Sequence, residues 1–174
     1  FRLSTRQIAE CYMVLGGVPF YLSKLSKAEG IAQNIDRLLF AEDGELHDEF
    51  SSLYNSLYKN AARHIKIVTA IATKGKGLTR QELIEKTSLS DNGKFSQMLE
   101  ELESCGFIRS YVPFVSETAR KRRTGVAGNK NSDTLYQLID PFTLFHFQVM
   151  RRADSSDANY WSNNQNSHVF TTWS

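Results

Sequence analysis

The chain has 174 residues, 41% of them hydrophobic, and a formal net charge of +2 at pH 7. This length and composition predict a globular protein with a buried core and one large or two small domains. Because the net charge is small, nucleic-acid binding would have to come from a local basic patch. The sequence shows no secretory apolar segment and no apolar run near the roughly 20 residues of a membrane-spanning helix. We therefore expect a cytoplasmic protein that does not bind a membrane.

Residues 1–58 predict a small all-helical domain. Ser4 with Gln7, and Ser26 with Glu29, have the spacing of capping boxes, in which each side chain satisfies a free backbone N–H of the other residue. Helices are expected to begin near Ser4, Pro19, Ser26 and Glu45. In the first helix, helical spacing places four residues on the inward face: Ile8, Cys11, Tyr12 and Leu15.

Residues 59–140 predict a winged helix. Its first helix is followed by the two helices of a helix-turn-helix, and a two-stranded β-ribbon then closes the domain. Apolar residues from Ile65 to Ala72 form the face of the first helix, and Thr79 with Glu82 forms a capping box for the second. A polar turn precedes the third helix, which begins near Lys94. The ribbon strands are expected within 107–115 and 135–139.

Residues 141–174 predict a packing helix and a linker. The helix begins at Pro141 and carries many aromatic residues, so we expect it to pack against the winged helix. The segment 155–168 is rich in Ser and Asn, which is typical of a linker. The chain opens at Phe1 without Met, which suggests a fragment of a longer protein.

No catalytic or metal-binding constellation is recognised in the sequence. The run from Gly125 to Ser132 lacks the spacing of a P-loop. The histidines lack the paired spacing of metal ligands, and Cys11 and Cys105 are expected to be buried free thiols. We therefore assign no catalytic residue and no metal site, and expect the chain alone not to catalyse a reaction.

Two groups of polar residues are candidates for contact with double-stranded DNA. The first lies at the start of the third helix and comprises Lys94, Ser96 and Gln97. The second lies in the predicted wing and comprises Arg120, Lys121, Arg122, Arg123 and Lys130. The alternative for the wing is an exposed basic loop without a partner. Three acids on the third helix, Glu100, Glu101 and Glu103, would repel phosphates and weigh against groove reading.

Six runs of the sequence are distinctive in combination: 15–22 (LGGVPFYL), 34–40 (NIDRLLF), 46–50 (LHDEF), 53–58 (LYNSLY), 99–108 (LEELESCGFI) and 138–145 (LIDPFTLF). Together they resemble the C-terminal half of the archaeal-type ATPases of the AAA+/STAND superfamily. The resemblance covers most of the chain. It implies a mainly α fold in which a helical lid bundle precedes the winged helix-turn-helix and its small β-ribbon.

The resemblance also implies parts outside the sequence. A P-loop core that binds ATP and Mg²⁺ would precede Phe1, and a nuclease-like domain would follow Ser174, so no cofactor is expected within the chain itself. Gly17, Val18 and Pro19 match the family's Gly-x-Pro motif near the nucleotide. Phe20 follows where many members have a sensor arginine, which leaves a simple helix–helix corner as the alternative.

Three functional hypotheses result. The first is a lid and winged-helix portion of an ATP-dependent switch protein, which relays the nucleotide state and is a candidate for DNA contact. The second is a DNA-binding winged-helix transcriptional regulator whose N-terminal helices dimerise. The third is a structural module that docks a partner domain.

Overall fold

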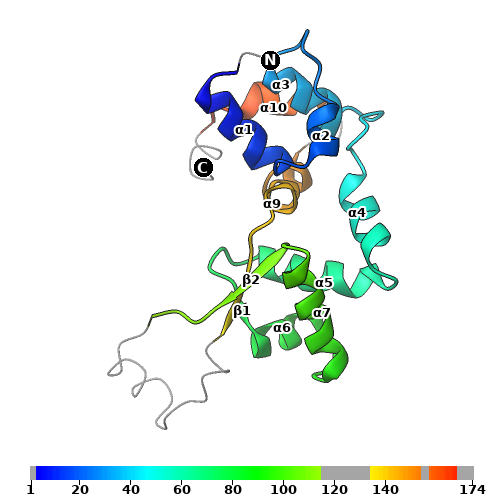
Figure 1. The fold of residues 1–174 in the computed structure, drawn as a ribbon, viewed down its shortest axis with the longest axis vertical. Coiled ribbons are helices and arrows are strands. Elements are labelled where there is room, and N and C mark those ends of the chain that lie inside the picture. The colour runs from blue at the N-terminus through cyan, green and yellow to red at the C-terminus, as the bar shows by residue number, and fades with distance from the viewer. Residues whose placement is uncertain (1–2, 115–133, 154–156, 168–174) are drawn as a thin grey trace. The chain divides into compact units, whose positions relative to one another are not determined.

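We describe the fold from a computed structural model that covers residues 3–114, 134–153 and 157–167. Within these residues the protein is mainly helical and has one small antiparallel sheet (Figure 1). The chain divides into two compact units. The helical unit combines residues 1–57 with 141–174, and the mixed unit comprises residues 58–140. Each unit is described by itself.

The helical unit is built from short helices. Their bounds are α1 Thr5–Leu15, α2 Pro19–Ser23, α3 Ile31–Ile35, the π-helix η1 Asp36–Phe40, α4 Glu49–Leu57, α9 Pro141–Gln148, the 3₁₀-helix η3 Met150–Arg152 and α10 Tyr160–Asn164. The predicted capping box at the start of α1 is confirmed, because the Ser4 hydroxyl accepts from the Gln7 backbone N–H and the Gln7 side chain accepts from the Ser4 backbone N–H.

The inward face of α1 was predicted only in part. Cys11 and Leu15 are buried, but Ile8 and Tyr12 are 56% and 59% exposed, and Val14 is fully buried in their place. The buried residues follow the i, i+3, i+4 spacing of one helix face, which packs on α9 and α3. The apolar spacing in the sequence therefore predicted burial of Ile8 and Tyr12 incorrectly.

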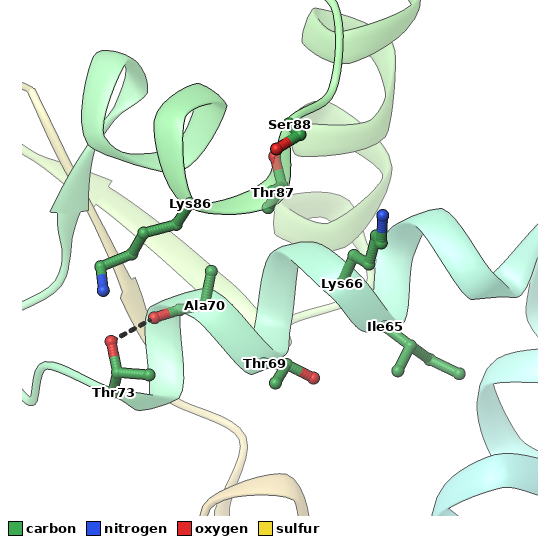
Figure 2. Close-up of a pocket in the computed structure, with 8 residues that line it drawn as sticks. All are labelled: Ile65, Lys66, Thr69, Ala70, Thr73, Lys86, Thr87 and Ser88. Carbon is green, nitrogen blue, oxygen red and sulfur yellow. Dashed lines mark hydrogen bonds between the residues drawn. The ribbon is translucent and has the colours of Figure 1, made fainter.

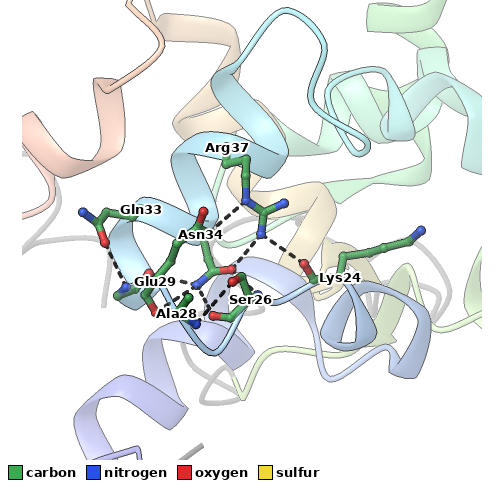
Figure 3. Close-up of polar contacts among 8 residues, drawn as sticks. Lys24, Ser26, Ala28, Glu29, Gln33, Asn34 and Arg37 are labelled. Atoms are coloured by element: carbon green, nitrogen blue, oxygen red, sulfur yellow. Dashed lines mark hydrogen bonds and ion pairs between the residues drawn. The ribbon is translucent and has the colours of Figure 1, made fainter.

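The predicted cap at Ser26 is wrong, because the helix that follows begins five residues later. The buried side chain of Asn34 holds the intervening loop instead (Figure 3). Its Oδ1 accepts from the Ser26 backbone N–H at 2.6 Å, and its Nδ2 donates to the backbone oxygens of Ser26, Glu29 and Gly30. Arg37 closes the network with bonds to Glu29 and to the Asn34 Oδ1.

Helix α9 provides aromatic side chains to the core of the helical unit. Phe142 lies 5.2 Å from the Tyr21 ring, and Phe145 lies 6.2 Å from the Phe40 ring, between ring centroids. Helix α9 belongs to the compact unit that contains residues 1–57, whereas the sequence led us to expect that it packs against the winged helix. The apolar pattern predicted burial but could not identify which surface would cover the helix.

The segment predicted as a linker contains α10, and Trp161 within it is only 4% exposed. The buried carboxylate of Asp36 accepts from the backbone N–H groups of Trp161 at 2.7 Å and Ser162 at 3.0 Å. The Trp161 indole N–H donates to Glu10 at 3.0 Å. The C-terminal segment is therefore held to the helical unit by specific hydrogen bonds, which the Ser- and Asn-rich composition concealed.

The mixed unit contains α5 Ala61–Ala72, β1 Leu78–Thr79, α6 Arg80–Thr87, α7 Gly93–Ser104, β2 Ile108–Tyr111 and β3 Leu135–Leu138. The sheet order is β1-β3-β2, with antiparallel pairs such as Leu78↔Tyr136 and Ile108↔Leu138. The predicted capping box of Thr79 and Glu82 is confirmed. The sequence predicted a two-stranded ribbon, but the described residues form three strands, because β1 pairs with β3 as an additional edge strand. With only two residues, β1 is too short to be recognised from a sequence pattern.

Apolar side chains from α5, α6, α7 and the sheet form the core of the mixed unit. The fully buried ones include Ile67, Ile71, Leu78, Leu83, Phe95 and Leu102. Both cysteines are free, as predicted, but only Cys11 is buried; Cys105 is exposed where α7 ends. None of the helices in the described ranges is long and apolar enough to cross a membrane.

Candidate nucleic-acid interface

The N-terminal half of α7 carries the first group of candidate residues. The helix begins after Asn92, whose side-chain oxygen accepts from the Phe95 backbone N–H at 3.2 Å. Lys94 and Gln97 are exposed and Ser96 is half-buried. Among the described residues Lys94 has no ion pair, so its ammonium group is available to an external anion.

Gln97 is held by a neighbouring acid on the same helix. Its Nε2 donates to Glu101 Oε1 at 2.8 Å, and the other Glu101 oxygen lies 2.8 Å from Nε2 of the buried His64. The His64 ring stacks on Tyr58 at 3.9 Å between centroids. The hydrogen bond with His64, followed by the one with Gln97, lowers the pKa of Glu101 and keeps it ionised.

Two of the three acids of α7 that we expected to repel DNA phosphates form hydrogen bonds within the protein. Besides the contacts of Glu101, the Glu103 carboxylate accepts from the backbone N–H of Ser110 at 2.8 Å and from its hydroxyl at 2.7 Å. Glu100 remains exposed. The negative charge on α7 is therefore used mainly to attach the helix to α5 and β2.

The turn between α6 and α7 is fixed by Arg80, a residue that sequence reasoning did not select. Its Nε and Nη2 both donate to Asp91 Oδ1, at 2.9 and 2.6 Å, and its guanidinium lies 5.0 Å from the Phe95 ring centroid. This pairing joins the start of α6 to the residues just before α7. The signal in the sequence was weak, because the partners are eleven residues apart.

The second group of candidates lies outside the described residues. It comprises Arg120, Lys121, Arg122, Arg123 and Lys130. The two strands on either side are described, and they pair as far as Tyr111↔Leu135.

Charge is divided unequally between the two units. Residues 58–140 contain 14 Lys and Arg against 9 Asp and Glu, a net charge of +5. The helical unit contains 7 Lys and Arg against 10 Asp and Glu, a net charge of −3. The total of +2 therefore conceals a basic unit and an acidic one, and the basic unit is the one that carries α7.

Gly17, Val18 and Pro19 lie in the helical unit and join α1 to α2. Gly17 has φ +70°, in the left-handed region that favours glycine, and a Cβ there would meet the Tyr12 ring at 3.3 Å. Val18 is extended and Pro19 is the first residue of α2. These residues form a tight corner between two helices, in the other unit from the α7 candidates.

A pocket of about 460 Å³ lies between α5 and the C-terminal end of α6 (Figure 2). Its lining consists of Ile65, Lys66, Thr69, Ala70, Thr73, Lys86, Thr87 and Ser88. Sequence reasoning missed it, because its lysines and hydroxyls belong to two helices and no motif joins them.

Comparison of the chain with family models, with curated proteins and with solved structures found no match.

Proposed function

We propose that the mixed unit is a winged helix that contacts double-stranded DNA. The order α5, β1, α6, α7, β2, β3 supports the fold, because a helix-turn-helix is followed by a strand pair that a short edge strand extends. In this proposal the start of α7 approaches the duplex with Lys94, Ser96 and Gln97, and the wing residues Arg120–Arg123 with Lys130 contact phosphates.

The concentration of positive charge on one unit carries this proposal. A net charge of +5 on residues 58–140 provides the attraction to phosphates that a total of +2 did not predict. Gln97 is engaged by Glu101, so contact through phosphates is favoured over reading of base edges. We therefore expect binding that depends strongly on salt and weakly on DNA sequence.

We propose further that the chain is the lid and winged-helix portion of an ATP-dependent switch protein of the AAA+/STAND type. The sequence resemblance supports this, together with the sharp corner at Gly17, Val18 and Pro19 that its Gly-x-Pro motif requires. The P-loop core with ATP and Mg²⁺ would precede residue 1, and a nuclease-like domain would follow residue 174. The helical unit would then transmit the nucleotide state to the mixed unit.

The DNA contact is tested by fluorescence anisotropy of a labelled generic duplex at increasing salt. Changing Arg120, Lys121, Arg122 and Arg123 to Ala is expected to weaken binding and to reduce the slope of log K against log salt, by about 0.9 for each phosphate that the variant no longer neutralises. A control removes four cations from the helical unit: Arg6, Lys27, Arg151 and Arg152. If both variants bind as the wild type does, the wing contact is wrong.

The switch proposal is tested in the longer protein that includes the ATPase core. Substituting Gly17→Ala and Pro19→Ala is expected to alter ATP affinity or turnover, because both changes disturb the corner between α1 and α2. Unchanged ATP binding and turnover in a folded variant would reduce the motif to a structural corner. A core without ATP binding would remove the switch proposal altogether.

One observation favours the second candidate, a winged-helix regulator that dimerises through its N-terminal helices. Helices α1 and α2 expose four large apolar side chains, Ile8, Tyr12, Phe20 and Leu22. Light scattering tests this candidate. If the wild type is a dimer and the double variant Ile8→Asp with Phe20→Asp is a monomer, the regulator is favoured. If the wild type is a monomer, the regulator is excluded.

A further inference from the structure

The pocket between α5 and α6 has the chemistry of an anion-binding site. Figure 2 shows one wall formed by successive turns of α5 and the opposite wall formed by the last residues of α6. Lys66 extends from α5 and Lys86 from α6, and none of the eight lining residues is acidic. The pocket is therefore positive on both walls.

Neither lysine has a counter-ion among the described residues, in contrast to two neighbouring cations of the mixed unit. Lys74 pairs with Glu82 at 2.6 Å, and Arg80 pairs with Asp91. Lys66 and Lys86 are exposed and form no ion pair within the part of the chain that the structure describes. The two side chains extend in different directions in Figure 2, and an anion in the pocket would attract both ammonium groups toward the space between α5 and α6.

The hydroxyl groups of the lining divide into two kinds. Thr73 and Thr87 donate their protons to backbone oxygens one turn earlier, Ala70 and Leu83, each at 2.7 Å. Thr69 and Ser88 also line the pocket, and their hydroxyl groups have no hydrogen-bond partner among the described residues. Ser88 sits where α6 ends, with a left-handed backbone at φ 54°, so its position is set by the turn.

We propose that this pocket binds a phosphate group through Lys66, Lys86, Thr69 and Ser88. Ammonium and hydroxyl groups are the side-chain donors that proteins use for phosphate oxygens. The phosphate comes either from a nucleic-acid backbone or from a free phosphate such as inorganic phosphate. The site is separate from the α7 candidates and does not depend on the proposed DNA contact.

The test is an NMR titration of the full 174-residue chain with inorganic phosphate at low salt. Amide shifts are expected at residues 65–73 and 86–88. Lys66→Gln with Lys86→Gln is expected to weaken binding at least about 10-fold, because two charge-assisted hydrogen bonds are removed. The control variant, Lys59→Gln with Lys76→Gln, changes two other exposed lysines that form no ion pair with a described residue, and should bind as the wild type does.

Three results would overturn the proposal: phosphate shifts that fall outside the pocket, no phosphate binding, or equal weakening by the two double variants. Because all four lysines are exposed, we expect both variants to fold, and their amide spectra verify this.

A second arm uses the labelled duplex and separates the two sources of phosphate. If the backbone supplies the phosphate, the pocket variant should lower the salt slope by about 1, with the control unchanged. If the pocket variant loses inorganic phosphate binding but keeps the wild-type slope, the site takes free phosphate. If the wild type binds inorganic phosphate and no duplex, the proposed DNA contact fails while the pocket stands.

Discussion

At the scale of single residues, burial changes the pKa of the His146 imidazole. Its ring stacks on Phe50 at 4.0 Å between centroids, and its buried Nδ1 has no hydrogen-bond partner among the described residues. Burial, with a smaller effect of the Arg151 charge, lowers the pKa of His146 from 6.5 to about 4. The folded protein therefore keeps this imidazole neutral where the unfolded chain would protonate it.

This shift predicts a loss of stability in acid. Between pH 6.5 and about 4 the unfolded chain binds more protons at His146, so its contribution is complete above pH 6.5 and falls as the pH falls. Because the ring is partly exposed, we expect about 1–2 kcal/mol rather than the full value of the shift. Urea unfolding at pH 7 and pH 4.5 should show a smaller pH dependence for His146→Phe than for the wild type; parallel curves would contradict the account.

Gly77 is a second residue that the fold constrains tightly. It has φ +85°, and a Cβ there would lie 2.3 Å from the Tyr136 backbone oxygen on the neighbouring strand β3. We expect Gly77→Ala to lower the free energy of unfolding by at least about 2 kcal/mol. Gly75→Ala is the matched control, because nothing lies within 4 Å of its Cβ. Equal urea midpoints for the two variants would show that β1 does not hold β3 closely.

At the scale of elements, local signals predicted some helix starts and missed others. Helix α4, for example, was expected from near Glu45 and begins at Glu49. The capping boxes at Ser4 and Thr79 were found because each depends on residues within one turn. The helix start at Ser26 and the linker at 155–168 were wrong, because the side chains of Asn34 and Asp36 hold these segments through hydrogen bonds that reach beyond one helical turn. No local pattern contains that information.

The candidate site shows the same division. The exposed polar residues at the start of α7 were identified from their order in the sequence. The occupation of Gln97 by Glu101, the support from His64 and the pairing of Arg80 with Asp91 depend on the packing of α5, α6 and α7. The Lys66 and Lys86 pocket was missed for that reason too.

The attachment of α10 gives a prediction at this scale. Asp36→Asn replaces one of the two oxygens that cap Trp161 and Ser162 with an N–H group, so we expect a loss of about 1–3 kcal/mol in the free energy of unfolding. In a Trp173→Phe background, the emission of Trp161 should shift to the red.

Asp157→Asn is the control, because the Asp157 side chain accepts only one local backbone N–H among the described residues, that of Asn159. If the Asp36 and Asp157 variants have equal stability and equal emission, the buried carboxylate does not hold α10.

At the scale of the whole molecule, the proposed DNA contact depends most on the unequal charge of the two units. The mixed unit at +5 is suited to phosphates, whereas the helical unit at −3 is repelled by them. A duplex should therefore meet residues 58–140 first. Raising the salt concentration should weaken the complex, because each phosphate contact releases counterions from the DNA.

Hydrogen–deuterium exchange of the full chain, with and without a saturating generic duplex, tests this claim most directly. We predict slower exchange in the first half of α7 and in peptides that cover residues 115–133, with little change in α1, α2 and α10. Protection confined to the helical unit, or none in the mixed unit while the duplex is bound, would contradict the proposal that residues 58–140 form the DNA-binding unit.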